Sequence, residues 1–313
     1  MKSSFVVPTY REELNIINHY KECVNSFYEV QKIFPKYREY EYLVIDNCSD
    51  DKTVEKVLSI RKNDKNVKLY VNDKNYGPVL SPFEGLKKST GDLVLLIAAD
   101  LQEPPTLLSD FVEAIEEGYE AGIGLKKKTK ENIIMWNLRG IYYLILKALG
   151  LVKVTSRFSG FGLYTRELIV KFLDNQLEEP SLRILLPIKT KNIKSFQYDH
   201  QERRNGQSSY NLYDYAKEAL KTIIRNSTKI SSIANILSLL LTFISLLMIP
   251  ITILTKLFFW EKMGTGVATI IVSMLIFNSG LLLLITLVLD RQGQILKRLK
   301  PKKIHVKHKE IYD

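Results

Sequence analysis

The chain has 313 residues, a formal net charge of +11 at pH 7 and a hydrophobic content of 46%. This length accommodates one sizeable core and a smaller second element, which excludes a large multidomain assembly. The only cysteines are Cys23 and Cys48, so a disulfide-stapled secreted domain is excluded and a reducing compartment fits. Because the apolar run at the N-terminus is too short for a signal peptide, we expect the chain to start in the cytosol.

Short aliphatic runs alternate with helical patterns through the first part of the chain. The expected strands are Phe5–Val7, Tyr42–Ile45, Val67–Val71 and Leu93–Ala98. The expected helices are Glu12–Tyr28, Thr53–Arg61, Pro82–Lys88 and Thr106–Glu117. This alternation predicts an α/β fold with a mostly parallel sheet covered on both faces, and with ligands bound at the carboxyl ends of the strands.

Two of the expected strands end in polar segments, residues 8–12 and residues 46–51. Because the carboxyl ends of parallel strands share one edge of a sheet, we expect these segments to emerge together. Acidic side chains there can accept hydrogen bonds from a nucleobase or a ribose. For either segment alone the alternative is a capping turn, because Asp, Asn and Ser favour helix starts.

A third segment, residues 91–105, delivers Asp100 and Gln102 to the end of a buried strand. Side chains two residues apart lie on the same side of a strand, so the two oxygen ligands are expected to lie together. Magnesium or manganese would take such hard ligands and complete its shell with diphosphate oxygens and water. The alternative is an acidic loop before a helix that begins at proline, which explains Glu103 and Pro104 but not the grouping.

Two segments of the second half have amphipathic helical patterns, near 132–152 and 211–228. Each combines aliphatic and aromatic residues with interspersed Lys and Arg, which favours a helix lying at a membrane surface. For the first segment an ordinary buried helix is an equal alternative.

Two apolar blocks follow, with 26 uncharged residues between Lys229 and Lys256 and 27 between Lys262 and Asp290. A membrane span needs about 20 apolar residues, so the blocks predict two transmembrane helices, at about 231–255 and 264–289. The expected domains are therefore a cytosolic domain over 1–228, the paired spans over 229–290 and a basic tail over 291–313.

The tail carries eight Lys and Arg residues against two acids. A basic stretch directly after an apolar block is typical of a cytoplasmic membrane flank attracted to anionic lipid, which argues against a nucleic-acid partner. We therefore expect a multi-pass protein of the cell (inner or plasma) membrane, with the domain over 1–228 and both termini in the cytoplasm. The oligomeric state stays open, a homo-oligomer included.

Three further motifs accompany the polar segments at the strand ends. They are residues 75–77 (Asn-Tyr-Gly), 159–163 (Ser-Gly-Phe-Gly-Leu) and 203–210, which contain an Arg-x-x-Gly-x-Ser pattern. In this order, and with the paired C-terminal spans, the chain resembles the family-2 glycosyltransferases of the dolichol-phosphate mannose synthase type, including bacterial polyprenyl-phosphate glycosyltransferases. The resemblance covers nearly the whole chain. It implies a GT-A fold and an inverting, metal-dependent transfer from a nucleotide sugar to undecaprenyl or dolichyl phosphate, with Mg²⁺ or Mn²⁺ as the cofactor.

The resemblance also implies roles for individual residues. The nucleotide-sugar pocket would be formed by Pro8, Tyr10, Glu12, Asp46, Asp51 and Asp100. Asp100 and Gln102 would hold the metal, and Arg203 and Ser208 would grip phosphates, with Asp100 and Arg203 as the catalytic residues. For Arg203 the alternative is a surface ion pair.

Two positions depart from the family pattern. Ala98 stands where relatives commonly carry the first acid of an Asp-x-Asp triplet, which removes one acidic group near the metal. Asn47 and Cys48 stand where relatives often have Asp-Gly, which leaves the second acid of that turn without a counterpart.

A phosphate monoester is largely dianionic near neutral pH, because its second pKa is about 6. It can therefore attack an anomeric carbon without a protein base, which fits the lack of a compelling catalytic histidine. A rival enzyme acting on a glycan or lipid-linked saccharide hydroxyl would need a base such as Glu178 or Glu179. A rival of another class is a membrane scaffold that lost activity with the acid at position 98. The sequence leaves the sugar and the nucleotide open.

Overall fold

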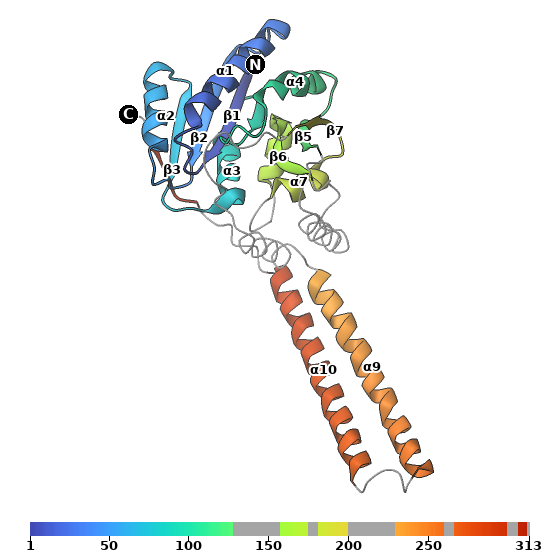
Figure 1. The fold of residues 1–313 in the computed structure, drawn as a ribbon. Coiled ribbons are helices and arrows are strands. Elements are labelled where there is room, and N and C mark those ends of the chain that lie inside the picture. The colour runs from blue at the N-terminus through green and yellow to red at the C-terminus, as the bar shows by residue number, and fades with distance from the viewer. Residues whose placement is uncertain (128–156, 175–180, 200–228, 260–265, 299–305, 312–313) are drawn as a thin grey trace. The chain divides into compact units, whose positions relative to one another are not determined.

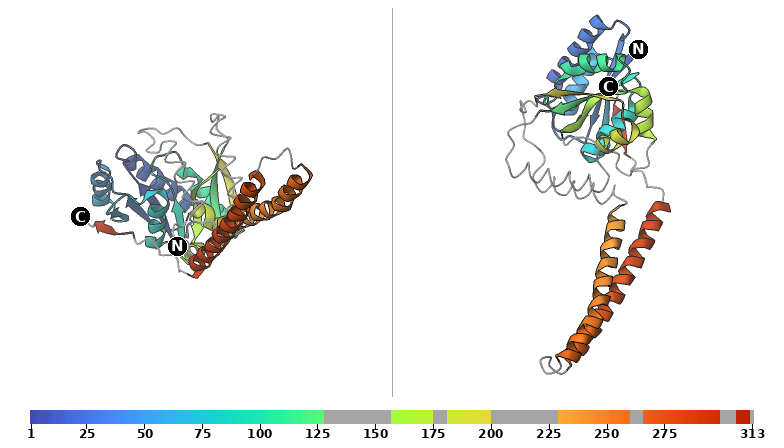
Figure 2. Two further views of the ribbon diagram at one scale, coloured as in Figure 1. Left: turned by 90° about the horizontal axis from the view of Figure 1, so that it is seen from below. Right: turned by 90° about the vertical axis from the view of Figure 1, so that its right-hand side faces the viewer.

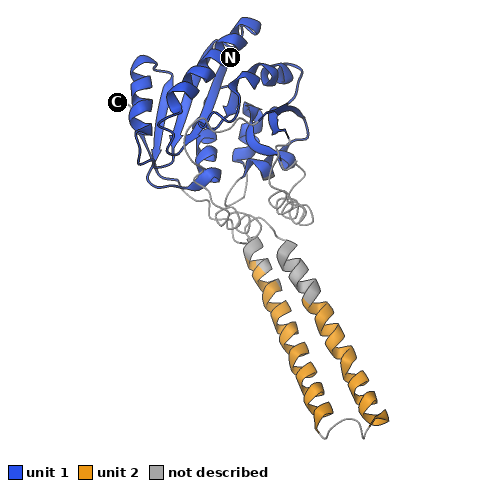
Figure 3. Cartoon of the chain, viewed as in Figure 1, with its two compact units in different colours: residues 1–221, 302–313 blue, residues 222–301 orange. Residues whose placement is uncertain are grey.

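The computed structural model describes residues 1–127, 157–174, 181–199, 229–259, 266–298 and 306–311. The chain divides into two compact units (Figure 3). The first comprises Met1–Lys221 together with Lys302–Asp313, and the second comprises Thr222–Pro301. The last residues of the chain therefore belong to the same unit as the first.

The first unit contains an eight-stranded sheet in the order β7-β5-β6-β4-β1-β2-β3-β8. Its strands are β1 (Lys2–Thr9), β2 (Glu39–Asp46), β3 (Val67–Asn72), β4 (Leu93–Leu96), β5 (Ala121–Lys126), β6 (Phe158–Thr165), β7 (Ile193–Tyr198) and β8 (His308–Ile311). Strands β4, β1, β2 and β3 run parallel to one another, and β5 runs parallel to β7. Strand β6 is antiparallel to β4 and β5, and β8 is antiparallel to β3. This arrangement confirms the α/β class and the mostly parallel sheet that the sequence predicts.

Helices cover both faces of the sheet (Figures 1 and 2). They are α1 (Ile16–Ile33), α2 (Thr53–Asn63), α3 (Gly77–Lys88), the 3₁₀ turn η1 (Pro105–Leu107), α4 (Leu108–Glu116), α6 (Arg166–Leu173) and α7 (Leu182–Lys189). In β1, Phe5 and Val7 pack into the core with α1, α2 and α4, while Val6 packs into a second core with α3, α6 and α7. A strand buried on both faces explains the uninterrupted apolar run.

The four predicted strands and their helices are present with shifted ends. Strand β4 stops at Leu96, two residues earlier than expected, because the chain turns directly after it. Helix α3 begins at Gly77 and contains Pro82, which the sequence pattern placed at the helix start. The sequence pattern did not predict β5, β6, β7 or β8.

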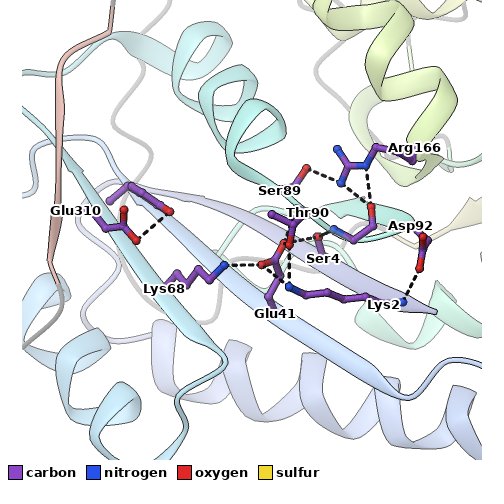
Figure 4. Close-up of polar contacts among 11 residues, drawn as sticks. Lys2, Ser4, Glu41, Lys68, Ser89, Thr90, Asp92, Arg166 and Glu310 are labelled. Atoms are coloured by element: carbon purple, nitrogen blue, oxygen red, sulfur yellow. Dashed lines mark hydrogen bonds and ion pairs between the residues drawn. The ribbon is translucent and has the colours of Figure 1, made fainter.

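A buried carboxylate lies near the amino ends of the central strands, at the opposite end of the sheet from the loops that follow their carboxyl ends (Figure 4). Glu41 in β2 is 1% exposed, and its Oε2 lies 3.0 Å from Lys2 Nζ and 2.9 Å from Lys68 Nζ. Its Oε1 accepts hydrogen bonds from Ser4 Oγ at 2.7 Å and from the Thr90 backbone N–H at 2.7 Å. Burial alone would raise the pKa of Glu41, but these bonds lower it to about 2. The charged cluster ties β1, β2, β3 and the segment before β4 together.

The second unit is a pair of long helices, α9 (Lys229–Phe258) and α10 (Val267–Arg298). The Ser238 and Thr286 hydroxyls are hydrogen-bonded to each other, which pairs the start of α9 with the end of α10 as an antiparallel hairpin. The apolar spans are Ser238–Phe258 and Val267–Leu289, with mean hydropathy of 2.2 and 2.4. Both are long and apolar enough to cross a membrane, and most of their apolar side chains are exposed.

The hairpin agrees with the two C-terminal spans expected at about 231–255 and 264–289. The amphipathic segments expected near 132–152 and 211–228 lie outside the described residues, as do Glu178 and Glu179. Of the basic tail over 291–313, the structure assigns the first part to α10 and His308–Ile311 to β8.

Candidate functional site

The loops that follow β1, β2 and β4 lie at the same edge of the sheet. The register pairs Thr9 with Asp46, so β1 and β2 end side by side. The backbone N–H of Asn47 donates to the Thr9 carbonyl at 2.9 Å, which extends this pairing one residue beyond the strands. The sequence-predicted segments 8–12 and 46–51 are therefore brought together as expected.

Each of these three loops contains one non-glycine residue in the left-handed region. Arg11 has φ 57°, Cys48 has φ 65° and Leu101 has φ 59°, and they are the only such residues in the described parts of the chain. This conformation costs an L-residue roughly 1–2 kcal/mol. Backbone strain of this kind concentrates at functional sites, where the surrounding structure enforces it. Three strained loops at one sheet edge mark this edge as the candidate site.

Asp46 orders the turn after β2. Its Oδ1 accepts from Ser49 Oγ at 2.6 Å, and its Oδ2 accepts from the Ser49 backbone N–H at 2.9 Å. The residue is fully buried, and burial raises the pKa of its carboxyl group despite these hydrogen bonds. The Arg11 backbone N–H donates to Ser49 Oγ at 2.9 Å, so the same serine connects the first loop to the second.

Arg11 and Asp50 form a bidentate pair on the surface of these loops. Arg11 Nε and Nη2 each lie 2.6 Å from an oxygen of Asp50. The guanidinium holds the pKa of Asp50 below its usual range, and it also stacks on the Tyr10 ring at 5.2 Å. The pair therefore connects the first two loops with a bidentate geometry that lysine could not reproduce. Tyr10 and Pro8 are half-buried.

Glu12 and Asp51 hold the starts of helices α1 and α2. Glu12 is buried, and its Oε2 accepts from Asn15 Nδ2 at 2.7 Å. Asp51 Oδ1 accepts from the Thr53 backbone N–H at 3.0 Å and from Thr53 Oγ1 at 2.6 Å, which is the capping role that the sequence left open. Its Oδ2 accepts from the Glu13 backbone N–H at 3.2 Å.

The candidate metal ligands Asp100 and Gln102 share one tight turn after β4. The Gln102 backbone N–H donates to Asp100 Oδ1 at 3.2 Å, and both side chains are half-buried. A carboxylate and an amide oxygen are donors that Mg²⁺ and Mn²⁺ accept, provided that ligand oxygens complete the shell. Among the described residues no group of three or more His, Cys, Asp or Glu side chains could hold a metal unaided.

Glu103 closes the turn that carries Asp100. It is 6% exposed, and its Oε2 accepts from the Ala98 backbone N–H at 3.1 Å. Its Oε1 accepts from Ser159 Oγ at 2.7 Å, which ties the turn to β6 and to the predicted motif 159–163. Burial raises the pKa of the Glu103 carboxyl group. The sequence explained Glu103 as part of an acidic loop, and the structure shows it as the brace of that loop.

His19 is a buried contributor that the sequence analysis did not identify. It lies in α1 with no exposed surface, and its Nδ1 is 2.6 Å from the Tyr42 hydroxyl. Its ring also makes a hydrogen bond with the backbone of Ala98, which connects α1 to the loop after β4. Burial lowers the pKa of His19 to about 3, so the ring is neutral near pH 7. Its position on the buried stripe with Ile16 and Cys23 was the available sequence signal.

Asn47 links the second loop to the loop after β3. Its Nδ2 donates to Asn75 Oδ1 at 2.7 Å, and its Oδ1 accepts from the Tyr76 backbone N–H at 2.9 Å. Asn72 Nδ2 also donates to Asn47 Oδ1, at 3.1 Å. Asn47 thus takes a structural role at the position where relatives often carry an acid. The remaining candidates, Arg203 and Ser208, lie outside the described residues.

Comparisons with known proteins identify the family of this chain. The profile of glycosyl transferase family 2 matches residues 4–173, which is more than half of the chain. The chain therefore belongs to glycosyl transferase family 2, and it is a glycosyltransferase.

Individual relatives have low sequence identity to this chain, but their matches cover most of it. An uncharacterized glycosyltransferase of Bacillus subtilis (strain 168), YkcC, is 25% identical over 98% of this chain and 93% of its own length. The undecaprenyl-phosphate 4-deoxy-4-formamido-L-arabinose transferase of Proteus mirabilis (strain HI4320) is 27% identical over 67% of this chain and 63% of its own length. The crystal structure of S. aureus TarS 1-349 with UDP-GlcNAc has a TM-score of 0.46 and 22% identity, over 72% of this chain and 67% of that chain.

Proposed function

We propose that this enzyme transfers a sugar from a nucleotide-sugar donor to a polyprenyl phosphate at the cytoplasmic face of the membrane, with inversion at the anomeric carbon. The observation that carries the proposal is the meeting of three strained loops, after β1, β2 and β4, at one edge of a family-2 sheet. Ligands of parallel α/β sheets bind at this edge. The named activity of the Proteus relative on undecaprenyl phosphate supports the acceptor class.

The donor nucleoside is proposed to bind against the first two loops. Pro8 and Tyr10 offer half-buried apolar surface there. Glu12 contacts the start of α1, Asp46 orders the turn after β2, and Ser49 and the Arg11–Asp50 pair connect the two loops. Such fixed loops bind a ligand without a further cost in ordering. Asp51 contributes by capping α2 beside the same pocket.

The donor diphosphate is proposed to lie over the turn of Asp100 and Gln102. A divalent cation held there would neutralise the charge that develops on the leaving nucleoside diphosphate. With Ala98 in place of an acid, Asp100 is the single carboxylate of this turn that faces the diphosphate, because Glu103 is committed to Ala98 and Ser159. We therefore expect weaker metal affinity than in relatives that carry both acids.

The reacting groups need positioning rather than a protein base. An oxygen of the lipid phosphate attacks the anomeric carbon as the bond from that carbon to the diphosphate breaks, and the leaving oxygen keeps the electron pair. The phosphate carries the required negative charge near pH 7, since its second pKa is about 6. Arg203 and Ser208 are proposed to hold donor or acceptor phosphates, for which an arginine fork is suited.

The order of the elements supports one orientation in the membrane. Strand β8 follows α10 and belongs to the same sheet as β1, so two spans return the chain to the side on which it began. Basic residues flank the spans at Lys229 and after Asp290, which favours the cytoplasmic side for both flanks.

Membranes containing the protein should be incubated with a panel of labelled nucleotide sugars, a divalent metal and undecaprenyl or dolichyl phosphate. We expect a labelled, negatively charged lipid product. The variant Asp100→Asn should lose about a hundredfold in rate, since the diphosphate charge is then poorly neutralised. The matched control is Asp92→Asn at the other end of β4, where the exposed side chain accepts from the Lys2 backbone N–H at 2.7 Å.

Equal labelling by wild type and Asp100→Asn would refute the metal assignment. Label that enters a glycan but no phospholipid would refute the acceptor class, and would favour the enzyme that acts on a hydroxyl group. Absence of any metal-dependent turnover of nucleotide sugar would favour the non-catalytic scaffold.

A further inference from the structure

The segment after the second membrane helix contributes the edge strand of the catalytic sheet. Helix α10 ends at Arg298, and β8 begins at His308. Strand β8 pairs antiparallel with β3 in the register Leu69 with Ile311 through Asn72 with His308. Figure 1 shows this strand beside β3, at the far edge of the sheet from β7. The pairing occurs within the first unit, so it does not depend on how the two units are arranged.

Side chains secure β8 along its length. The Tyr70 hydroxyl donates to Glu310 Oε1 at 3.1 Å, and the Tyr70 ring meets the His308 ring edge-on at 5.5 Å. Ile311 packs against the core that contains β1, β2 and β3. An edge strand held by backbone bonds, aromatic contact and apolar burial is a built element of the fold rather than a loose tail.

The start of this segment reaches the loop that follows β3. The Asp73 backbone N–H donates to the Lys307 carbonyl at 3.1 Å, and the Lys307 backbone N–H donates to the Tyr76 hydroxyl at 3.2 Å. The Tyr76 hydroxyl in turn donates to Asp73 Oδ1 at 2.7 Å. Residues 73–76 are therefore tied to the C-terminal segment at both ends of the loop.

The same loop holds the turn after β2 from the other side. The Tyr76 backbone N–H donates to Asn47 Oδ1 at 2.9 Å, and Asn75 Oδ1 accepts from Asn47 Nδ2 at 2.7 Å. Asn47 directly follows Asp46, whose carboxylate orders that turn. A continuous series of hydrogen bonds therefore runs from Lys307 through Tyr76 to Asn47 and the proposed nucleoside pocket.

We propose that residues 307–311 are a positioning element of the donor site, which hold the loop of Asn75 and Tyr76, and through Asn47 the turn after β2, in the conformation that binds the nucleotide. This inference rests on the donor site proposed above and extends it. Along the chain, nine residues (299–307) separate the end of α10 from the start of β8.

The test variant is Lys309→Pro in the full-length protein in detergent. Alternate pairs of an antiparallel ladder are hydrogen-bonded, and the Asp73–Lys307 bond sets the phase, so the Lys309 N–H faces β3 at Val71. Proline removes that donor and breaks the strand. Lys309→Ala is the matched control, because it keeps the backbone N–H and the Lys309 side chain is exposed.

A second control separates positioning from general loss of stability. Phe172→Leu in α6 weakens the other core, which contains neither β3 nor β8. Binding of UDP and of GDP, each with Mg²⁺, is measured by calorimetry well below the unfolding midpoint of every variant. We expect Lys309→Pro to bind the preferred nucleotide about tenfold more weakly. This change corresponds to the net free energy of about one hydrogen bond that no longer orders the loop. Lys309→Ala and Phe172→Leu should bind as wild type does.

Hydrogen exchange supplies the readout that does not depend on activity. The Asp73 amide should exchange faster in Lys309→Pro than in Lys309→Ala. Because coupling between two sites is reciprocal, nucleotide binding should slow exchange at residues 307–311 of the wild type.

Three outcomes overturn the inference, and they are distinguishable. If no nucleotide binds the wild-type chain, the proposed donor site is wrong and the positioning role is lost with it. If nucleotide binds, and Lys309→Pro shows a freed Asp73 amide with unchanged affinity, the donor site stands and the positioning role alone is wrong. If Lys309→Pro and Phe172→Leu weaken nucleotide binding equally, the effect is a general loss of stability, and β8 has a structural role only.

Discussion

Replacing Glu41 by Gln probes the charge cluster that joins the amino ends of the central strands. The Glu41 carboxylate is 1% exposed and lies 3.0 Å from Lys2 Nζ and 2.9 Å from Lys68 Nζ. A glutamine side chain still accepts from Ser4 and Thr90, but its neutral amide cannot form the two ion pairs. Because the lysine side chains are about 30% exposed, water solvates them in the variant and limits the loss.

The size of the effect follows from the pKa. The folded-state pKa of Glu41 is lowered from 4.5 to about 2. Each unit corresponds to about 1.4 kcal/mol, so the ionised carboxylate contributes on the order of 3 kcal/mol to the free energy of unfolding. Since the folded pKa is depressed, this contribution is fully present above pH 4.5 and is lost as the pH falls towards 2. Glu41→Gln lacks it at every pH.

Thermal unfolding of the first unit, followed by near-ultraviolet circular dichroism of the full-length protein in detergent, measures the difference. At pH 7 we expect Glu41→Gln to unfold about 4–8 °C below wild type, allowing about 2 kcal/mol after screening and about 2–4 °C per kcal/mol. The gap should narrow as the pH falls below 4.5. Glu39→Gln, an exposed position on the same strand, should unfold within about 2 °C of wild type. A gap that stays constant between pH 7 and pH 3 would show that the ion pairs are not its cause.

Three further variants test the candidate site. Cys48→Gly should raise the midpoint of thermal unfolding by about 2–4 °C, because glycine adopts the left-handed conformation at φ 65° without strain. A midpoint below that of the wild type would show that the turn is not strained. The pKa of His19 is lowered from 6.5 to about 3, so the unfolded chain binds a proton at a higher pH than the folded chain does. As the pH falls from 6.5 to 3, the free energy of unfolding of the wild type should therefore decrease by about 1.4 kcal/mol per pH unit. His19→Gln should remove that part of the slope in the same assay, and an unchanged slope would refute a neutral buried ring. Ser159→Ala should lower kcat/KM for the donor about tenfold in initial-rate measurements. The reason is that Glu103 loses one of its two hydrogen-bond partners, which loosens the turn that carries Asp100. A kcat/KM equal to that of the wild type would show that the bond from Ser159 to Glu103 has no role in the reaction.

The first part of the fold is readable from the sequence because local signals agree with the tertiary structure. The runs at Phe5–Val7 and Tyr42–Ile45 are apolar on both faces, and each strand of the central sheet is buried on both faces. The polar segments at their ends identified the edge of the sheet where the candidate site lies. These signals depend on residues close in sequence, so a single chain reveals them.

The antiparallel part of the sheet has weaker local signals. Strand β6 contains Gly160 and Gly162, which suggest a loop when the sequence is considered alone. In the structure a Cβ on Gly162 would lie 2.7 Å from the Gly122 carbonyl oxygen, so glycine is needed for the close approach of β5 and β6. Strand β8 has the sequence His-Lys-Glu-Ile, whose charge indicates solvent, and it forms because β3 offers an unpaired backbone edge.

In the candidate site, the sequence identified side chains but not their partners. Asp46, Glu12 and Asp100 were predicted from strand ends and from family resemblance. The structure places Asp46 at the end of β2, Glu12 after β1 and Asp100 after β4, at the same edge of the sheet. The bond from Ser159 to Glu103 joins residues far apart in the chain, and no local pattern encodes it. The same holds for His19 beside Ala98, because their contact exists only once α1 packs on the sheet.

The central claim is tested most directly by stoichiometry with purified protein in lipid nanodiscs that contain undecaprenyl phosphate. The labelled nucleotide sugar that gives product in membranes is supplied with Mg²⁺ or Mn²⁺, and released nucleoside diphosphate and labelled lipid are counted together. We predict one glycolipid for each nucleoside diphosphate, with both products absent when the lipid phosphate or the metal is omitted. Nucleoside diphosphate released at the same rate without the lipid phosphate would contradict the account.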